Sequence, residues 1–227
     1  MKRFVIAFVA AGVGAALGVW AVSSRQPTSN RQQLDPSEDP RNAIVGPEKI
    51  HPVTADMVRA TAKLAKQEAP DFALIGDDGR TYRLRELART KPVVLFFIVN
   101  LCPCCVTARP YIGRVNKAYQ GAATFLGVID GDAKTAKLWA RNNAPGFPIL
   151  ADPKLGTIRS YHAKRGTYMT LIAPGGTIDK VYPGYSQSLV TELGRRIAAL
   201  AGTPEKTIEV ADLPKEATTG CPFNVPE

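Results

Sequence analysis

The sequence has few of the residues that mark several common protein classes. Its 227 residues include four cysteines, two histidines and two tryptophans, and aromatic residues make up 7%. A small domain built on disulfides needs more cysteines, spread along the chain, so that class is excluded. The net charge of +9 comes from scattered basic residues without interleaved aromatic ones. We therefore expect a solvated surface and no nucleic-acid partner.

The N-terminus predicts a protein that leaves the cytoplasm. Lys2 and Arg3 precede an uncharged apolar stretch from Phe4 to Val22, about as long as the roughly 20 residues that cross a bilayer. The two charges predict that the N-terminus stays inside and the remainder crosses. We expect residues 1–22 to be a membrane anchor with a periplasmic or other extracytoplasmic domain behind it. A cleaved signal peptide and a secreted protein are the alternative, because residues 21–23 resemble a cleavage site.

Composition divides the rest of the chain into three parts. Residues 23–47 are polar and rich in turn-forming residues, which predicts a flexible linker. Residues 48–202 hold regular apolar patterns and are long enough for one domain with a full core. Residues 203–227 are rich in proline and predict an extended C-terminal tail, which carries Cys221.

Strand-like and helix-like patterns alternate through the predicted domain. The stretch 93–99 is an unbroken apolar run, typical of a central strand that is buried on both faces. Together the patterns predict an α/β fold with a central mixed sheet and helices on both faces. Further strands are expected at 124–129, 147–150, 168–173 and 178–182, and helices at 54–67, 133–143, 152–161 and from Ser186 to Gly202.

Three of the four cysteines follow the central strand within four positions. Cys102, Cys104 and Cys105 are placed where a helix begins, with Pro103 suited to its first turn. Free amide hydrogens and the helix dipole favour a thiolate there, so we expect an acidic sulfur at Cys102 that solvent can reach. Cys105, two residues beyond Pro103, is within reach as the second thiol of an exchange reaction. Cys104 is either an alternative second thiol or a buried bystander.

The chain resembles the redoxin group of the thioredoxin superfamily, which includes the AhpC/TSA peroxiredoxins and the TlpA/ResA thiol–disulfide oxidoreductases. The motifs that carry the resemblance are APDF at 69–72, PVVLFF before the C-P-x-C, and LIAPGGTI at 171–178. It covers about residues 68–202 and implies a thioredoxin-like fold. Thr167 takes the position of the active-site-loop proline, and Leu101 that of the tryptophan before the first cysteine. Val99 stands where peroxiredoxins have threonine or serine.

These observations favour a thiol–disulfide oxidoreductase that needs no cofactor or metal. Its substrates would be protein thiols or disulfides, and a membrane reductant or thioredoxin-like protein would supply electrons. A thiol peroxidase that reduces hydroperoxides is the first alternative, since Cys221 resembles the C-terminal resolving cysteine of two-cysteine peroxiredoxins. A copper chaperone of the Sco type, with two cysteines and a distant histidine as ligands, is the second. His162 lies some three positions before the place expected for that histidine, and the C-x-C-C spacing differs from the C-x-x-x-C of that group. No carboxylate or histidine is placed by the sequence as a general base.

Overall fold

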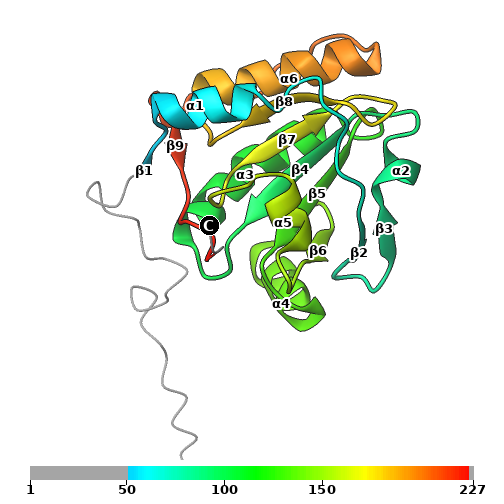
Figure 1. Ribbon diagram of the computed structural model, residues 1–227. Coiled ribbons are helices and arrows are strands. Elements are labelled where there is room, and N and C mark those ends of the chain that lie inside the picture. Colours follow the sequence, from blue (N-terminus) through cyan, green and yellow to red (C-terminus); the bar gives the residue numbers. More distant parts are fainter. Residues whose placement is uncertain (1–50, 225–227) are drawn as a thin grey trace, which may run out of the picture. The chain divides into compact units, whose positions relative to one another are not determined.

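The computed structural model describes residues 51–224 (Figure 1). The predicted anchor at residues 1–22 and the predicted linker at 23–47 lie outside this range. Within it, no helix combines the length and the apolar character that a membrane crossing requires.

A five-stranded sheet forms the centre of the fold, in the order β6-β5-β4-β7-β8. The central strand is β4 (Val93–Ile98), and β5 (Thr124–Ile129) and β6 (Ile149–Ala151) follow it in parallel on one side. On the other side β7 (Met169–Ile172) pairs antiparallel with β4, and β8 (Ile178–Tyr182) pairs antiparallel with β7. The predicted mixed sheet is therefore confirmed, and its most apolar run lies at the centre.

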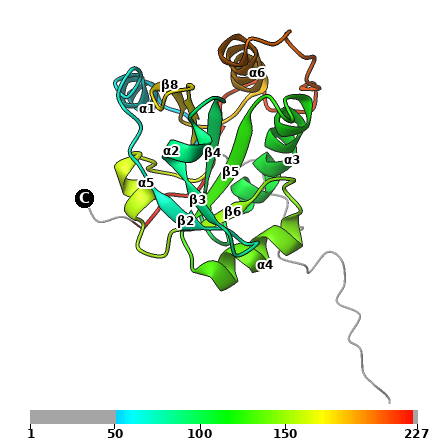
Figure 2. The same cartoon turned by 90° about the vertical axis from the view of Figure 1, so that its right-hand side faces the viewer.

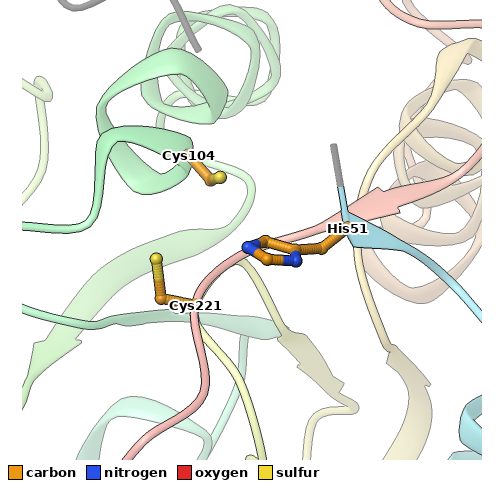
Figure 3. A group of neighbouring side chains, drawn as sticks. All are labelled: His51, Cys104 and Cys221. Atoms are coloured by element: carbon orange, nitrogen blue, oxygen red, sulfur yellow. The ribbon is translucent and has the colours of Figure 1, made fainter. Parts of the chain in front are cut away.

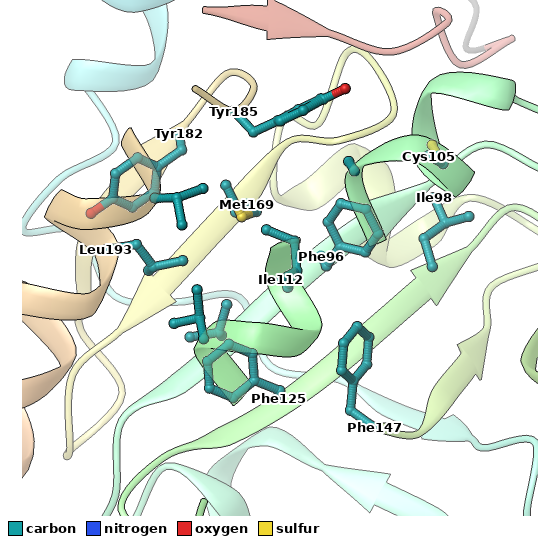
Figure 4. Packing of buried hydrophobic residues seen from close by; sticks show 14 of the residues in the cluster. Phe96, Ile98, Cys105, Ile112, Phe125, Phe147, Met169, Tyr182, Tyr185 and Leu193 are labelled. Atoms are coloured by element: carbon teal, nitrogen blue, oxygen red, sulfur yellow. The ribbon is translucent and has the colours of Figure 1, made fainter. Parts of the chain in front are cut away.

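The central strand β4 is buried along its whole length because both faces of the sheet are covered. Val94, Phe96 and Ile98 pack with α3 (Pro103–Ala118) and α6 (Gln187–Ala201). The alternate residues Val93, Leu95 and Phe97 pack on the opposite face, with α5 (Gly156–Ser160). Figure 2 shows α3 and α5 on opposite sides of the sheet, and Figure 4 shows the packing around Phe96. The period-two alternation of a strand thus builds two cores.

Local sequence signals fix the ends of several helices. Asp132 accepts a hydrogen bond from the backbone N–H of Thr135 at 2.8 Å and begins α4 (Ala133–Asn143). Ser186 caps α6 in the same way, and Gly202 ends it with a left-handed φ of 62°. Thr54 caps α1 (Ala55–Ala62), which ends five residues before the predicted boundary. The chain turns after α1, and the backbone N–H of Lys66 donates a hydrogen bond to the carbonyl of Ile178 in β8.

A short hairpin and helix precede the central strand. Strands β2 (Ala73–Ile75) and β3 (Thr81–Arg83) pair antiparallel through a turn in which Gly79 has a φ of 80°. The helix α2 (Leu84–Leu87) follows directly.

The C-terminal tail packs against the domain. Its strand β9 (Thr218–Thr219) pairs antiparallel with β1 (His51–Pro52), and His51 stands opposite Thr219 (Figure 1). At Gly184 the tail lies so close that an added Cβ would be 2.1 Å from the Thr218 carbonyl oxygen. Leu213 and Phe223 are buried in the two cores. Residues beyond 202 therefore contribute to the folded unit.

Candidate redox site

Cys102 occupies the residue immediately before α3, at the end of the loop that leaves β4. Its backbone is extended, and Pro103 is the first residue of the helix, as predicted. The Cys102 sulfur accepts a hydrogen bond from the backbone N–H of Cys221, with a distance of 3.3 Å between nitrogen and sulfur. The positive end of the helix and this amide both favour a negative charge on the sulfur.

The four cysteines form one sulfur cluster, and all four thiols are free. Hydrogen bonds from the thiols of Cys104 and Cys105, with smaller contributions from Cys221, hold the pKa of Cys102 well below its ordinary value. The same hydrogen bond to Cys102, together with burial, raises the pKa of Cys104. Burial is the main cause that raises the pKa of Cys105, and it raises that of Cys221 to about 11. These shifts favour Cys102 over the other three sulfurs as the place for a negative charge.

The prediction that solvent reaches Cys102 is wrong for the structure with the C-terminal tail packed on the domain. The residue is only 3% exposed. Cys104 and Cys105 are also buried, whereas Cys221 is partly exposed. The cause is the C-terminal tail, because the segment that holds Cys221 lies on Cys102.

The tail is held over the site by backbone hydrogen bonds to the loop before β7. Gly220 donates to the carbonyl of Gly166 at 2.9 Å, and Gly166 donates to the carbonyl of Cys221 at 2.8 Å. The backbone N–H of Phe223 continues this pairing and donates to the carbonyl of Lys164 at 3.0 Å. An added Cβ at Gly220 would lie 2.7 Å from the carbonyl oxygen of Gly166. The two backbones can therefore pair this closely because residue 220 is glycine.

The loop that includes Thr167 lies against the cysteines, as its expected position implies. A Cβ added to Gly166 would be 2.6 Å from the Cys105 sulfur, so this backbone directly covers that thiol. Thr167 is fully buried, has a left-handed φ of 67°, and donates its backbone N–H to the carbonyl of Phe97 at 2.8 Å. The loop thus joins β4, Cys105 and the tail.

Asp130 is a residue near the sulfurs that the sequence did not indicate. It follows β5 and accepts a hydrogen bond from the backbone N–H of Asn100 at 2.5 Å. Burial raises the pKa of Asp130, and the negative charge of Cys102 adds to the shift. The one signal in the sequence was its position directly after a buried strand. The carboxyl ends of parallel strands lie at the same edge of the sheet, so Asp130 could be expected near the end of β4.

A groove opens beside the start of α3, next to Cys102. Leu101, which precedes Cys102, is 89% exposed and has a left-handed φ of 62°. The groove has a volume of about 600 Å³. Its lining includes Leu101, Pro103, Val106 and Trp139. A partly apolar groove therefore lies beside the sulfur cluster.

One group of histidine and cysteine side chains within residues 51–224 is close enough to share a metal ion. It consists of His51, Cys104 and Cys221, whose ligand atoms all lie within 4.8 Å of one another (Figure 3). His162, which lies some three positions before the place of the histidine ligand in the Sco type, is exposed and does not belong to this group. The pairing of β1 with β9 brings His51 to the cysteines instead.

Comparison with known proteins gives a family and a fold. The AhpC/TSA family model matches residues 65–181, just over half of the chain. None of the curated proteins matches. A proposed thiol:disulfide interchange protein, DsbE, from Chlorobium tepidum is 25% identical, with a TM-score of 0.55 over 61% of this chain and 98% of that one. Peroxidoxin BcpB from Mycobacterium tuberculosis shares the fold at 20% identity, with a TM-score of 0.52 over 62% of this chain and 97% of that one.

Proposed function

We propose that this chain, which belongs to the AhpC/TSA family, is a thiol–disulfide oxidoreductase with Cys102 as its attacking sulfur. The observation that carries the proposal is the position of that sulfur. It stands at the start of α3, accepts the backbone N–H of Cys221 at 3.3 Å, and has the other three thiols around it. The similarity to the thiol:disulfide interchange protein supports the same reaction.

In the first step the Cys102 thiolate attacks one sulfur of a substrate disulfide. A bond forms between Cys102 and that sulfur, the substrate disulfide breaks, and the other substrate sulfur leaves as a thiolate. Cys102 is the attacker because its neighbours stabilise the charged form, whereas Cys104, Cys105 and Cys221 have raised pKa values. The tail must move away first, since Cys102 is buried beneath it.

In the second step another thiolate of the cluster attacks the Cys102 sulfur. This forms an internal disulfide and releases the substrate as a thiol, so two electrons pass to the substrate. Cys105 is our primary candidate for this role because it lies within the same helix start. Cys221 is a further candidate, since the tail already places it on Cys102. Cys104 remains a possible third partner in the exchange.

A membrane reductant or a thioredoxin-like protein would then reduce the internal disulfide and complete the cycle. We propose that this occurs outside the cytoplasm, with the protein attached to the membrane by residues 1–22. The apolar N-terminal sequence supports this location. Leu101 and the groove beside it offer a partner protein an apolar contact next to Cys102.

A thiol peroxidase is the second candidate, and the contact between Cys221 and Cys102 favours it. The Cys102 thiolate would attack a hydroperoxide, release an alcohol and become a sulfenic acid. The Cys221 thiol would condense with the sulfenic acid, forming a disulfide and water. Val99, in place of the peroxiredoxin threonine or serine, weighs against this reaction because it brings no hydroxyl to the peroxide.

Insulin reduction and peroxide consumption, measured side by side with the same dithiol as electron source, test the proposal. We expect the protein to accelerate insulin reduction and to consume hydrogen peroxide at little more than the background rate. Fast, Cys102-dependent peroxide consumption without insulin reduction would replace the proposed function with the peroxidase. No Cys102-dependent turnover in either assay would refute both reactions.

A further inference from the structure

Two side chains at the sulfur cluster are neither the attacking sulfur nor our primary candidate for the second thiol of the exchange reaction. His51 lies in β1, and Cys104 occupies the second residue of α3. Both lie near Cys221, which follows β9 in the tail (Figure 3). Three segments that are far apart in the sequence thus bring one imidazole and two thiols together.

The spacing of these three side chains is slightly wider than that of three ligands bound to one metal ion. Their ligand atoms, which are one ring nitrogen of His51 and the two sulfurs, all lie within 4.8 Å of one another. Metal–sulfur bonds of about 2.3 Å and metal–nitrogen bonds of about 2.0 Å place neighbouring ligands roughly 3.5–4 Å apart. Small side-chain rotations would therefore bring all three atoms to bonding distance.

The ligand types select a thiophilic ion. Two thiolates and an imidazole suit Zn²⁺ and Cu⁺, whereas Mg²⁺ and Ca²⁺ require oxygen ligands, and this group has no carboxylate. Cys104 is buried, while His51 and Cys221 are partly exposed. An ion can thus enter from the solvent side and be held against the start of α3.

We propose that His51, Cys104 and Cys221 form a binding site for one thiophilic metal ion, Zn²⁺ or Cu⁺. The site exists only while the tail is docked, because β9 holds His51 opposite Thr219 and places Cys221 two residues further along. It also requires reduced thiols. A disulfide that includes Cys221 removes one ligand, so the ion and that disulfide exclude each other.

Metal titration of the reduced full-length protein tests the site. Zn²⁺ is measured by competition with a chromogenic chelator, and Cu⁺ by competition with bicinchoninate in the absence of oxygen. We expect one ion per chain. His51→Ala and Cys104→Ser should each weaken the affinity for the ion at least roughly tenfold, because even the loss of a residue that only supports a ligand lowers metal affinity by about that factor. His162→Ala is the matched control and should bind like the wild type, because His162 is exposed and outside the group. Tight binding of either ion supports the site and identifies the metal.

A second measurement, the rate of Cys221 alkylation, uses the wild-type protein and so does not depend on whether a variant folds. A saturating ion should slow the alkylation of the partly exposed Cys221 by at least tenfold. The site is refuted if neither ion binds, if His51→Ala binds like His162→Ala, or if the ion leaves Cys221 alkylation unchanged. Cys102→Ser should keep the ion while losing exchange activity, so this proposal and the proposed function fail separately.

Discussion

Replacing Cys102 with serine is expected to abolish thiol–disulfide exchange. A serine hydroxyl is not ionised near neutral pH and cannot form the mixed disulfide, so the covalent route is lost. The rate of insulin reduction should fall on the order of a thousandfold or more, as it does when other enzymes lose an attacking nucleophile. Insulin precipitation in the presence of a dithiol, compared with the dithiol alone, measures the effect.

Cys104→Ser is the matched control for this prediction. Cys104 lies two residues away in the same cluster, but its raised pKa makes it a poor attacker. A serine hydroxyl can still donate a hydrogen bond to the Cys102 sulfur, so the Cys104→Ser protein should keep most of its insulin reduction. Cys105→Ser should instead accumulate a mixed disulfide between Cys102 and the substrate if Cys105 is the thiol that releases it. Equal losses in Cys102→Ser and Cys104→Ser would contradict the assignment of Cys102.

Gly220→Ala is expected to loosen the tail and expose Cys102. The added Cβ would lie 2.7 Å from the carbonyl oxygen of Gly166, so the backbones must separate. Overpacking of this kind costs about 1–3 kcal/mol, and each 1.4 kcal/mol is a factor of ten in an equilibrium. If alkylation follows local opening of the tail, Cys102 should react roughly 5- to 140-fold faster with iodoacetamide. Peptide mass spectrometry at timed intervals measures this rate.

Gly156→Ala provides the matched control for the tail experiment. Gly156 begins α5, and its added Cβ would be 3.9 Å from the nearest atom, Oδ1 of Asp152, which is an ordinary contact. Alkylation of Cys102 should match the wild-type rate in this variant. A Gly220→Ala protein that is folded and reacts no faster than Gly156→Ala would show that the tail does not control access to Cys102.

Much of the fold could be predicted because it is encoded in short stretches of sequence. The apolar run at 93–99 forms the buried central strand β4, which ends at Ile98, and Pro103 begins the helix behind it. The pair Ser186 and Gly202 defines α6 at both ends. Each signal operates within a few residues, through alternation, capping or a left-handed glycine. The cysteines of the C-P-C-C stretch could be located for the same reason.

The covering of the site could not be predicted because it depends on contacts between distant residues. The pairing of His51 with Thr219 and of Gly166 with Gly220 joins segments with no shared local pattern. Burial of Cys102 follows from these contacts, and so does the approach of His51 to the sulfurs. The one local hint was Gly220 beside Cys221, since a glycine allows two backbones to approach closely.

The most direct test of Cys102 as the attacking sulfur is the pattern of disulfides in the oxidised protein. The reduced protein is treated with one equivalent of a small disulfide oxidant, free thiols are alkylated in acid, and peptides are mapped without reduction. Each internal disulfide that forms should include Cys102, joined to Cys105 or to Cys221. A disulfide between Cys104 and Cys221, with Cys102 recovered as the alkylated thiol, would contradict the account.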